Sequence, residues 1–155
     1  MSPQTQTVET DAEPAVESKR VFAATPERLF AAWTEAEALA AWKGPESMTT
    51  TVDVLEMKVG GRYRFVMTGE AGKYVGGGEY LEIDPPRRRA FTWAWEEGDM
   101  AGVETIVGVD FKATDAGTEI TVLHRRLPSA EAREAHTGGW NRSFVCLDRH
   151  LAETA

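Results

Sequence analysis

The spacing of the hydrophobic positions divides the chain into a short mixed N-terminal part, a long middle part and a final helix. Residues 16–23 predict a first strand. Residues 25–27 (Thr-Pro-Glu) then predict a helix start, because they combine a capping hydroxyl, a proline at the first helical position and an acid in the first turn. A second short helix is expected over 35–42, ended by the Gly-Pro pair at 44–45.

From residue 50 onward the hydrophobic positions alternate with a period of two, which is typical of half-buried strands. The predicted strands are 50–56, 62–67, 74–83, 89–96, 103–113 and 118–125. Short connections containing Gly or Pro separate them, and such connections favour consecutive antiparallel hairpins over crossovers.

The last segment, from Pro128 to Leu151, predicts a long amphipathic helix with Ser129 as its N-cap. One apolar stripe runs along it at helical spacing. The stripe consists of Trp140, Phe144, Leu147 and Leu151. The pair Gly138-Gly139 interrupts this helix at a cost of about 1 kcal/mol per glycine relative to alanine, so we expect another group to come very close to the backbone there.

The element order predicts an α+β fold in which helices cover one face of a curved antiparallel sheet of about seven strands. Two short helices follow the first strand, and the long C-terminal helix crosses the open face of the sheet. We expect a cavity between this helix and the sheet. Residues 16–155 are predicted to form one domain, and residues 1–15, which lack an apolar period, a flexible N-terminal tail.

Composition and charge narrow the function classes. Of the 155 residues, 42% are hydrophobic and 27% charged, as is usual for a globular protein. The net charge of −8 argues against nucleic acid or an anionic membrane as partner, because both need a concentrated basic surface. The lone Cys146 gives no sign of an oxidising compartment, and neither a signal peptide nor a membrane-spanning run is present, so a cytoplasmic location is expected.

Aromatic residues dominate the candidate ligand-binding residues. Trp93 and Trp95 share a face of one predicted strand with Phe91, and Tyr63 and Phe65 share a face of another. If these faces look toward Trp140 and Phe144 on the final helix, the rings line a large apolar space. The alternative is that they simply fill the core. In the first case, a polar ligand group could accept the indole and phenol hydrogens that need a partner when buried.

Four further candidates are expected beside this space. Thr105 and Val107 lie on the apolar face of their strand, and His124 ends the strand whose inward residues include Val122. His124 could orient a polar ligand group or act as an acid or base, unless it lies at the cavity mouth and is hydrogen-bonded to backbone. His136 lies one turn before Trp140, so it either reaches the cavity or occupies an exposed rim.

Other charged residues carry weaker expectations. Glu79 would be a buried carboxylate with a raised pKa if its strand parity faces inward. The run Arg87-Arg88-Arg89 predicts a solvated turn, with phosphate binding as the alternative. His136 and His150 are fourteen positions apart, or about 21 Å along a helix, so they cannot share a metal ion. We expect neither a metal nor a cofactor.

An ordered set of short motifs carries a resemblance to a known family. It comprises residues 20–34, 39–42, 60–65 (GGRYRF), 78–86, 91–93, 117–124 and 139–140. Together these resemble the bacterial relatives of the C-terminal domain of the heat-shock chaperone ATPase activator, within the START-like (SRPBCC) superfamily. The resemblance covers about residues 16–152. It implies a helix-grip fold, with a curved antiparallel sheet around a long C-terminal helix and a ligand cavity between them, and it suggests a role in the stress response.

Three functions follow as expectations, because fold alone does not fix function. The first is non-catalytic binding of a small hydrophobic or amphipathic molecule in the cavity. The second is a cyclase- or hydratase-like enzyme that uses His124 or Glu79 as acid or base. The third is a chaperone-binding module, which the absence of a companion N-terminal region makes less favoured. The sequence also leaves open whether the protein forms a homodimer.

Overall fold

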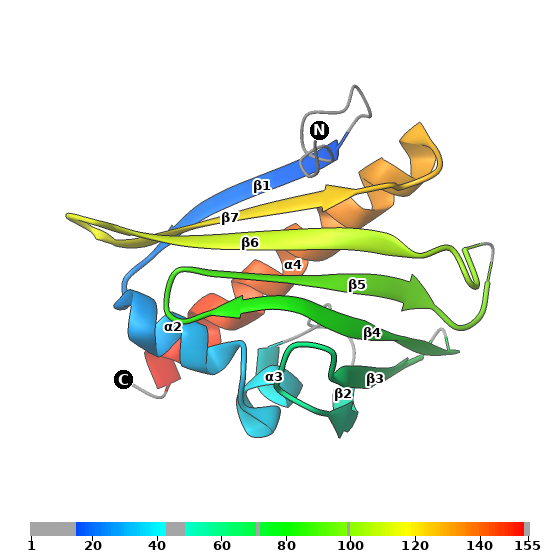
Figure 1. Cartoon of the computed structure of the whole chain (residues 1–155), viewed down its shortest axis with the longest axis horizontal. Coiled ribbons are helices and arrows are strands. Elements are labelled where there is room, and N and C mark those ends of the chain that lie inside the picture. Colours follow the sequence, from blue (N-terminus) through cyan, green and yellow to red (C-terminus); the bar gives the residue numbers. More distant parts are fainter. Residues whose placement is uncertain (1–14, 43–48, 71, 99, 154–155) are drawn as a thin grey trace.

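A single antiparallel sheet of seven strands, in the order β1-β7-β6-β5-β4-β3-β2, forms one layer of the molecule (Figure 1). The computed structural model describes residues 15–42, 49–70, 72–98 and 100–153. The strands are β1 (Ala15–Phe22), β2 (Thr49–Leu55), β3 (Arg62–Gly69), β4 (Gly72–Asp84), β5 (Arg88–Trp95), β6 (Thr105–Thr114) and β7 (Gly117–Arg125). All six predicted hairpin strands and the first strand are therefore confirmed, with ends shifted by at most two residues. The predicted tail lies outside the described residues except for Ala15, as does the Gly-Pro pair at 44–45.

Three helices complete the fold: α2 (Pro26–Ala32), α3 (Ala36–Trp42) and α4 (Ala130–Glu153). The predicted caps of α2 and α4 are present. Thr25 Oγ1 accepts a hydrogen bond from the Arg28 N–H at 3.2 Å, and Ser129 Oγ accepts one from the Ala132 N–H at 3.0 Å. Each cap satisfies a backbone donor that has no partner within its own helix.

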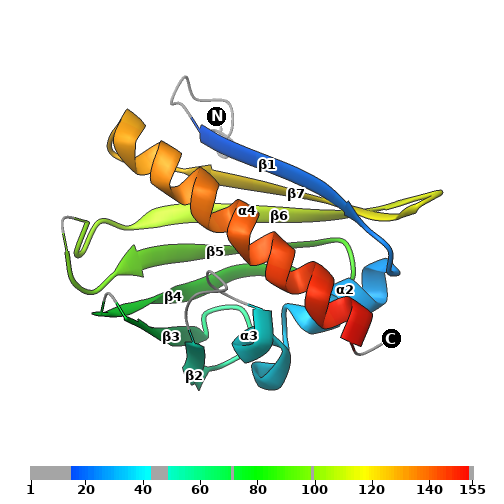
Figure 2. The same ribbon diagram turned by 180° about the vertical axis from the view of Figure 1, so that it is seen from behind.

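Helix α4 runs diagonally across one face of the sheet, and α2 and α3 lie near its C-terminal end (Figure 2). Its predicted apolar stripe is buried against the sheet. Phe144 meets Phe22 of β1 edge-on at 5.6 Å between ring centroids, and Trp140 stacks on Trp33 at 6.0 Å. This arrangement is the predicted helix-grip α+β fold, and it places one face of β5, β6 and β7 opposite α4.

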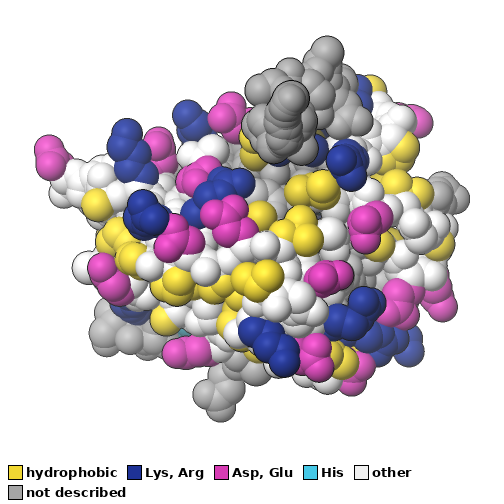
Figure 3. All heavy atoms as spheres, viewed as in Figure 1, with side chains coloured by type: hydrophobic (Ala, Val, Ile, Leu, Met, Phe, Trp, Pro, Cys, Tyr) yellow, Lys and Arg dark blue, Asp and Glu magenta, His cyan; other side chains and the backbone are white. Residues whose placement is uncertain are grey.

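The outer face of the sheet carries acidic and basic side chains interspersed among hydrophobic ones (Figure 3). Many of these charges are paired across strands. Arg88, for example, contacts Glu82 of β4 at 3.0 Å and Asp110 of β6 at 2.9 Å. Such exposed pairs contribute little stability each, but they leave these arginines with acidic partners.

Two charged residues depart from expectation. Glu79 is exposed, so the prediction of a buried carboxylate is wrong: the inward residue of this part of β4 is its neighbour Tyr80 at 3% exposure, whereas Leu81 is 44% exposed. A register shift in the pairing with β5 follows Tyr80 and ends the simple alternation on which that prediction rested. Arg89 is 1% exposed, so the prediction of a solvated turn is wrong for this residue of the run.

Candidate functional site

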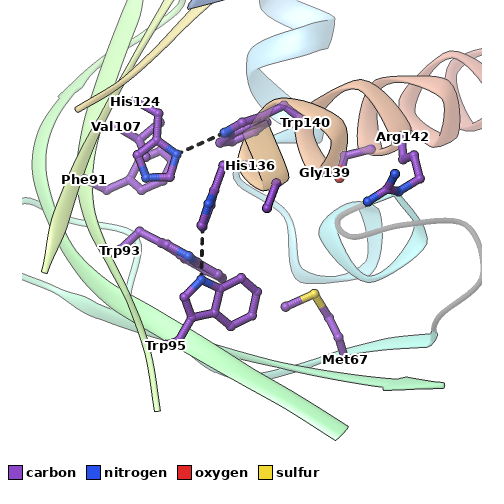
Figure 4. A pocket seen from close by; sticks show the side chains of 12 residues that line it. Met67, Phe91, Trp93, Trp95, Val107, His124, His136, Gly139, Trp140 and Arg142 are labelled. Carbon is purple, nitrogen blue, oxygen red and sulfur yellow. Dashed lines mark hydrogen bonds between the residues drawn. The ribbon is translucent and has the colours of Figure 1, made fainter. Parts of the chain in front are cut away.

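A cavity of about 200 Å³ lies between α4 and the inner face of β5, β6 and β7. Figure 4 shows the side chains that surround it. They are Met67, Phe91, Trp93, Trp95, Val107, His124, Ala135, His136, Gly139, Trp140, Arg142 and Ser143. The hollow expected between the long helix and the sheet is therefore present.

Two periodicities bring these residues together. On β5, every second residue (Phe91, Trp93 and Trp95) faces the cavity, as alternation in a strand requires. On α4, four residues at spacings of i, i+3, i+4 and i+7 form the facing wall. They are His136, Gly139, Trp140 and Ser143. The cavity thus lies where the aromatic face of β5 meets one stripe of α4.

The two helix glycines have different surroundings. A Cβ atom at Gly138 would lie 3.3 Å from Nη1 of Arg142 on the same helix, whereas a Cβ atom at Gly139 would have no atom within 4 Å. The expectation that another group approaches the backbone closely is therefore wrong at Gly139. This glycine borders open space, and its missing side chain adds to the cavity.

His124 belongs to a chain of hydrogen bonds. Which group donates in each bond follows from the Trp140 indole at one end, which can only donate, and from a backbone carbonyl at the other, which can only accept. The Trp140 indole can only donate, so its Nε1–H donates to His124 Nδ1 at 3.2 Å. In the neutral imidazole, Nε2 then carries the proton and donates to Thr105 Oγ1 at 2.8 Å. The Thr105 hydroxyl donates in turn to the Trp93 carbonyl at 2.8 Å. The plain alternative of a histidine bonded to backbone at the cavity mouth is wrong, because His124 is 1% exposed and both ring nitrogens bond side chains.

His136 takes the opposite tautomer by the same reasoning. Its Nδ1 lies 2.7 Å from the Ala132 carbonyl, which can only accept, so Nδ1 carries the proton. Its Nε2 accepts the Trp95 Nε1–H at 3.1 Å. The two imidazoles meet edge to face, with their centroids 5.1 Å apart. The predicted approach of His136 to the cavity is therefore present, and its ring is part-buried.

These bonds change what the cavity offers to a ligand. Of the three indoles that line the cavity, two already donate their N–H groups to histidines, namely Trp95 and Trp140. His124 and Thr105, expected to orient a polar group, already bond one another. The wall consequently presents mainly apolar atoms to the space inside.

Arg142 brings a positive charge to the edge of the cavity (Figure 4). It is exposed, and within the described part of the chain it has no hydrogen bond and no ion pair. Arg20, Arg64, Arg87 and Arg88 by contrast each contact a carboxylate within 3.0 Å.

Six of the ten predicted site residues line the cavity: Trp93, Trp95, Val107, His124, His136 and Trp140. The other four are buried nearby without lining it. Tyr63 donates its hydroxyl hydrogen to the Thr92 carbonyl, and Phe65 packs on Trp93 at 6.3 Å between ring centroids. Phe144 fills the core beside Phe22, and Thr105 holds His124.

Sequence reasoning left several lining residues out of the site, including Met67, Gly139, Arg142 and Ser143. A signal for two of them was available, because Gly139 and Ser143 lie three and seven positions after His136 and so share its helix face. A signal also marks Met67, because it follows Tyr63 and Phe65 on β3 at the strand period of two and so shares their face.

The described residues include no group of three or more His, Cys, Asp or Glu side chains placed to hold a metal ion. None of the described helices combines the length and apolar character that crossing a membrane requires.

Comparison with known proteins adds a family and structural relatives. The family described as "Activator of Hsp90 ATPase homolog 1-like protein" matches residues 23–152. An AHSA1 protein from Silicibacter pomeroyi is 28% identical with a TM-score of 0.81, over 92% of this chain and 100% of that one. A protein from Rhodobacter sphaeroides is 29% identical with a TM-score of 0.78, over 94% of this chain and 96% of that one. A protein from Chromobacterium violaceum is 27% identical with a TM-score of 0.77, over 88% and 96%. No curated protein matches the sequence.

Proposed function

This chain belongs to the family of activator of Hsp90 ATPase homolog 1-like proteins, and from that premise we propose that it binds a small apolar or amphipathic molecule in the cavity beneath α4 without transforming it. The observation that carries the proposal is the open space at Gly139, in the middle of a helix that would be more stable with alanine there. A helix position that sacrifices stability and leaves a void is best explained by a guest that fills it.

The size and walls of the cavity support a compact ligand. Its volume of about 200 Å³ exceeds the roughly 150 Å³ of an engineered apolar cavity that admits benzene. It is below the range of about 300–1,000 Å³ that drug-sized ligands occupy. Indole rings and aliphatic side chains around it favour a flat or branched apolar body of one or two rings.

The hydrogen bonds of the wall support binding without catalysis. A general acid or base needs a nitrogen or oxygen directed at the reacting group. His124 has both ring nitrogens engaged by Trp140 and Thr105, and Glu79 is exposed on the other face of β4. The two residues of the enzyme hypothesis are therefore poorly placed for such a role.

The position and charge of Arg142 favour an amphipathic ligand with an anionic end. The interior satisfies its own polar groups, so a polar ligand end gains most at the edge, where water and this guanidinium are both accessible. Because Arg142 has no carboxylate partner among the described residues, an incoming anion would not compete with an existing ion pair.

The test uses 2-naphthoate and its neutral counterpart 2-naphthalenemethanol, which share an apolar body and differ in charge. Titration followed by the indole N–H resonances should shift those of Trp95 and Trp140, which line the cavity. The resonance of Trp42, whose Nε1–H donates to the Ala32 carbonyl at 2.8 Å in the core, is the internal control. Arg142→Gln should weaken naphthoate binding and leave the alcohol unaffected. Shifts confined to surface amides, or none, would refute cavity binding.

Chaperone binding is a second candidate, favoured by the description of the family. It predicts that the purified protein raises the ATPase rate of an Hsp90-type chaperone. An unchanged rate at saturating protein, together with shifts on naphthoate titration, would leave ligand binding as the function. On either reading we propose a cytoplasmic location, since the one cysteine is buried and free.

A further inference from the structure

Three buried side-chain atoms in the described part of the chain have no hydrogen-bond partner, and all three are donors: Nε and Nη1 of Arg89 and Nε1 of Trp33. Buried polar groups are nearly always hydrogen-bonded, so an unpaired one needs a specific explanation. Here they belong to two neighbouring side chains, because the Arg89 Cζ lies 6.0 Å from the centroid of the Trp33 ring.

Arg89 is almost completely enclosed. Its exposure is 1% and that of Trp33 is 2%. Phe30, Trp33 and Tyr80 surround the guanidinium, with ring centroids 5.1–6.0 Å from Cζ. Its Nη2 lies 3.4 Å from the sulfur of Met57. A sulfur atom is a weak acceptor, and aromatic rings attract a cation without accepting the in-plane N–H groups of a guanidinium as strong hydrogen bonds.

No described acidic side chain compensates the charge. None of the ion pairs among these residues includes Arg89. Burial lowers the pKa of its guanidinium, the neighbouring Tyr80 hydroxyl opposes this shift, and arginine keeps its proton in proteins. Burial also raises the pKa of both Tyr63 and Tyr80, so these neighbours are neutral phenols that supply no negative charge at neutral pH.

We propose that Arg89 and Trp33 form an internal anion site, in which a small anion (a halide or a carboxylate group) accepts hydrogen bonds from one of the two unpaired Arg89 nitrogens and from the Trp33 indole. An anion provides what this cluster lacks, namely a negative charge and acceptor capacity for several donors. A water molecule could accept hydrogen bonds from the same donors, but it would leave the buried positive charge uncompensated.

The site is distinct from the ligand cavity. Arg89 and Phe91 are successive inward residues of β5, about 7 Å apart along the strand. Phe91 lines the cavity, whereas neither Arg89 nor Trp33 does. The Trp33 ring stacks against Trp140 at 6.0 Å between ring centroids, whereas His124 meets Trp140 edge to face at 6.3 Å. The anion site can therefore be occupied whether or not the cavity holds a ligand.

Thermal and urea unfolding in sodium bromide against sodium gluconate, at constant ionic strength, test the site, because the hydroxyl-rich chain of gluconate is too polar to bury among these aromatic side chains. Above the dissociation constant, the unfolding equilibrium constant should fall about tenfold for each tenfold rise in bromide. Arg89→Met should abolish this dependence, and Trp33→Phe should weaken it. Arg142→Gln, which removes a cation elsewhere, should keep it. Equal stability in both salts, or an unchanged dependence in Arg89→Met, would overturn the proposal.

Diffraction from wild-type crystals grown in bromide gives the answer even if Arg89→Met fails to fold. Anomalous density should lie within hydrogen-bond distance of Arg89 Nε or Nη1, and its absence from that position would overturn the site. Acetate and octanoate then distinguish the two sources of the anion. Stabilisation by acetate identifies a free ion, whereas stabilisation by octanoate alone that persists in Gly139→Leu and is lost in Arg89→Met identifies the head of a larger compound. Gly139→Leu, which fills the ligand cavity, should leave the bromide effect intact and so separates this proposal from the proposed function.

Discussion

Replacing Gly139 tests the idea that this residue exists to leave room. Gly139→Ala adds one methyl group to the middle of α4, at a point where the Cβ atom would have no neighbour within 4 Å. The helix should gain about 1 kcal/mol from the substitution, because glycine loses more backbone freedom on folding than alanine. A gain of this size raises the unfolding midpoint by about 2–4 °C in a protein of this length.

Gly138→Ala is the matched control. It offers the same helix gain one position earlier, outside the cavity lining, and its methyl group requires only a small shift of the flexible Arg142 guanidinium at 3.3 Å. Both alanine variants should therefore be at least as stable as the wild type. They should differ in binding, because only the methyl group at Gly139 takes cavity volume.

Gly139→Leu enlarges the effect. Its side chain reaches into the space between Trp93 and Trp140, so the affinity for 2-naphthoate should fall at least tenfold, or by about 1.4 kcal/mol. Calorimetric titration gives the affinity, and urea unfolding gives the stability. The stability of Gly139→Leu should equal or exceed that of the wild type. A loss of about 1–3 kcal/mol, as overpacked cores show, would mean that the space at Gly139 is not open.

The remaining predictions concern the hydrogen bonds and the buried tyrosines. Thr105→Val should lower the free energy of unfolding by about 1–3 kcal/mol by leaving the His124 Nε2–H unpaired, whereas Thr105→Ser should stay near the wild type; equal stability of the two variants in urea titrations would contradict the network. Long-range nitrogen–proton NMR spectra should show His124 as the Nε2–H tautomer and His136 as the Nδ1–H tautomer, and the reverse pair would contradict the assigned donors. Because burial raises the pKa of Tyr63 and Tyr80 in the folded state, their contribution to stability is complete below the unfolded pKa of about 10 and should fall as the pH rises above it, by up to about 1.4 kcal/mol per pH unit for each tyrosine. Tyr80→Phe should remove the contribution of one tyrosine to this pH dependence, as measured by urea titrations at alkaline pH. An unchanged pH dependence would show that Tyr80 does not contribute to it.

Local sequence signals predicted the elements well because their causes are local. The caps at Thr25 and Ser129 need only a side-chain oxygen and the first turn of the helix that follows. Alternation on β5 and β6 is likewise a property of the strand itself. The fold class followed from the order of these elements, and the seven-stranded sheet with α4 across it confirms it.

The prediction of which residues face the core failed where contacts with neighbouring strands break the simple alternation. The alternative in which Glu79 faces inward, on the same strand parity as Leu81, fails because the ring of Tyr80 packs on Tyr63 at 5.0 Å and occupies that face instead. The run of three arginines looks uniform in sequence. Only the pairing of β5 with both β4 and β6 directs Arg89 inward and Arg88 toward Asp110 on the outside.

The polar bonds inside the cavity were also beyond sequence reasoning. Periodicity placed His124 and Thr105 on inward faces, but the tautomer of His124 depends on Trp140, which approaches from another element. The role of Gly139 was misjudged for a similar reason. A glycine that permits close contact and a glycine that leaves a void look identical in a sequence, and only the distance to the opposite wall separates them.

The most direct test of the account is a crystal structure of the protein grown with 6-bromo-2-naphthoate. We predict anomalous bromine density in the cavity, with the naphthalene between Trp93, Gly139 and Trp140 and the carboxylate toward Arg142. Crystals that show the compound only on the surface at saturating concentration, or a Trp95 or Trp140 ring turned into the cavity to fill it, would contradict the claim that α4 leaves room for a ligand.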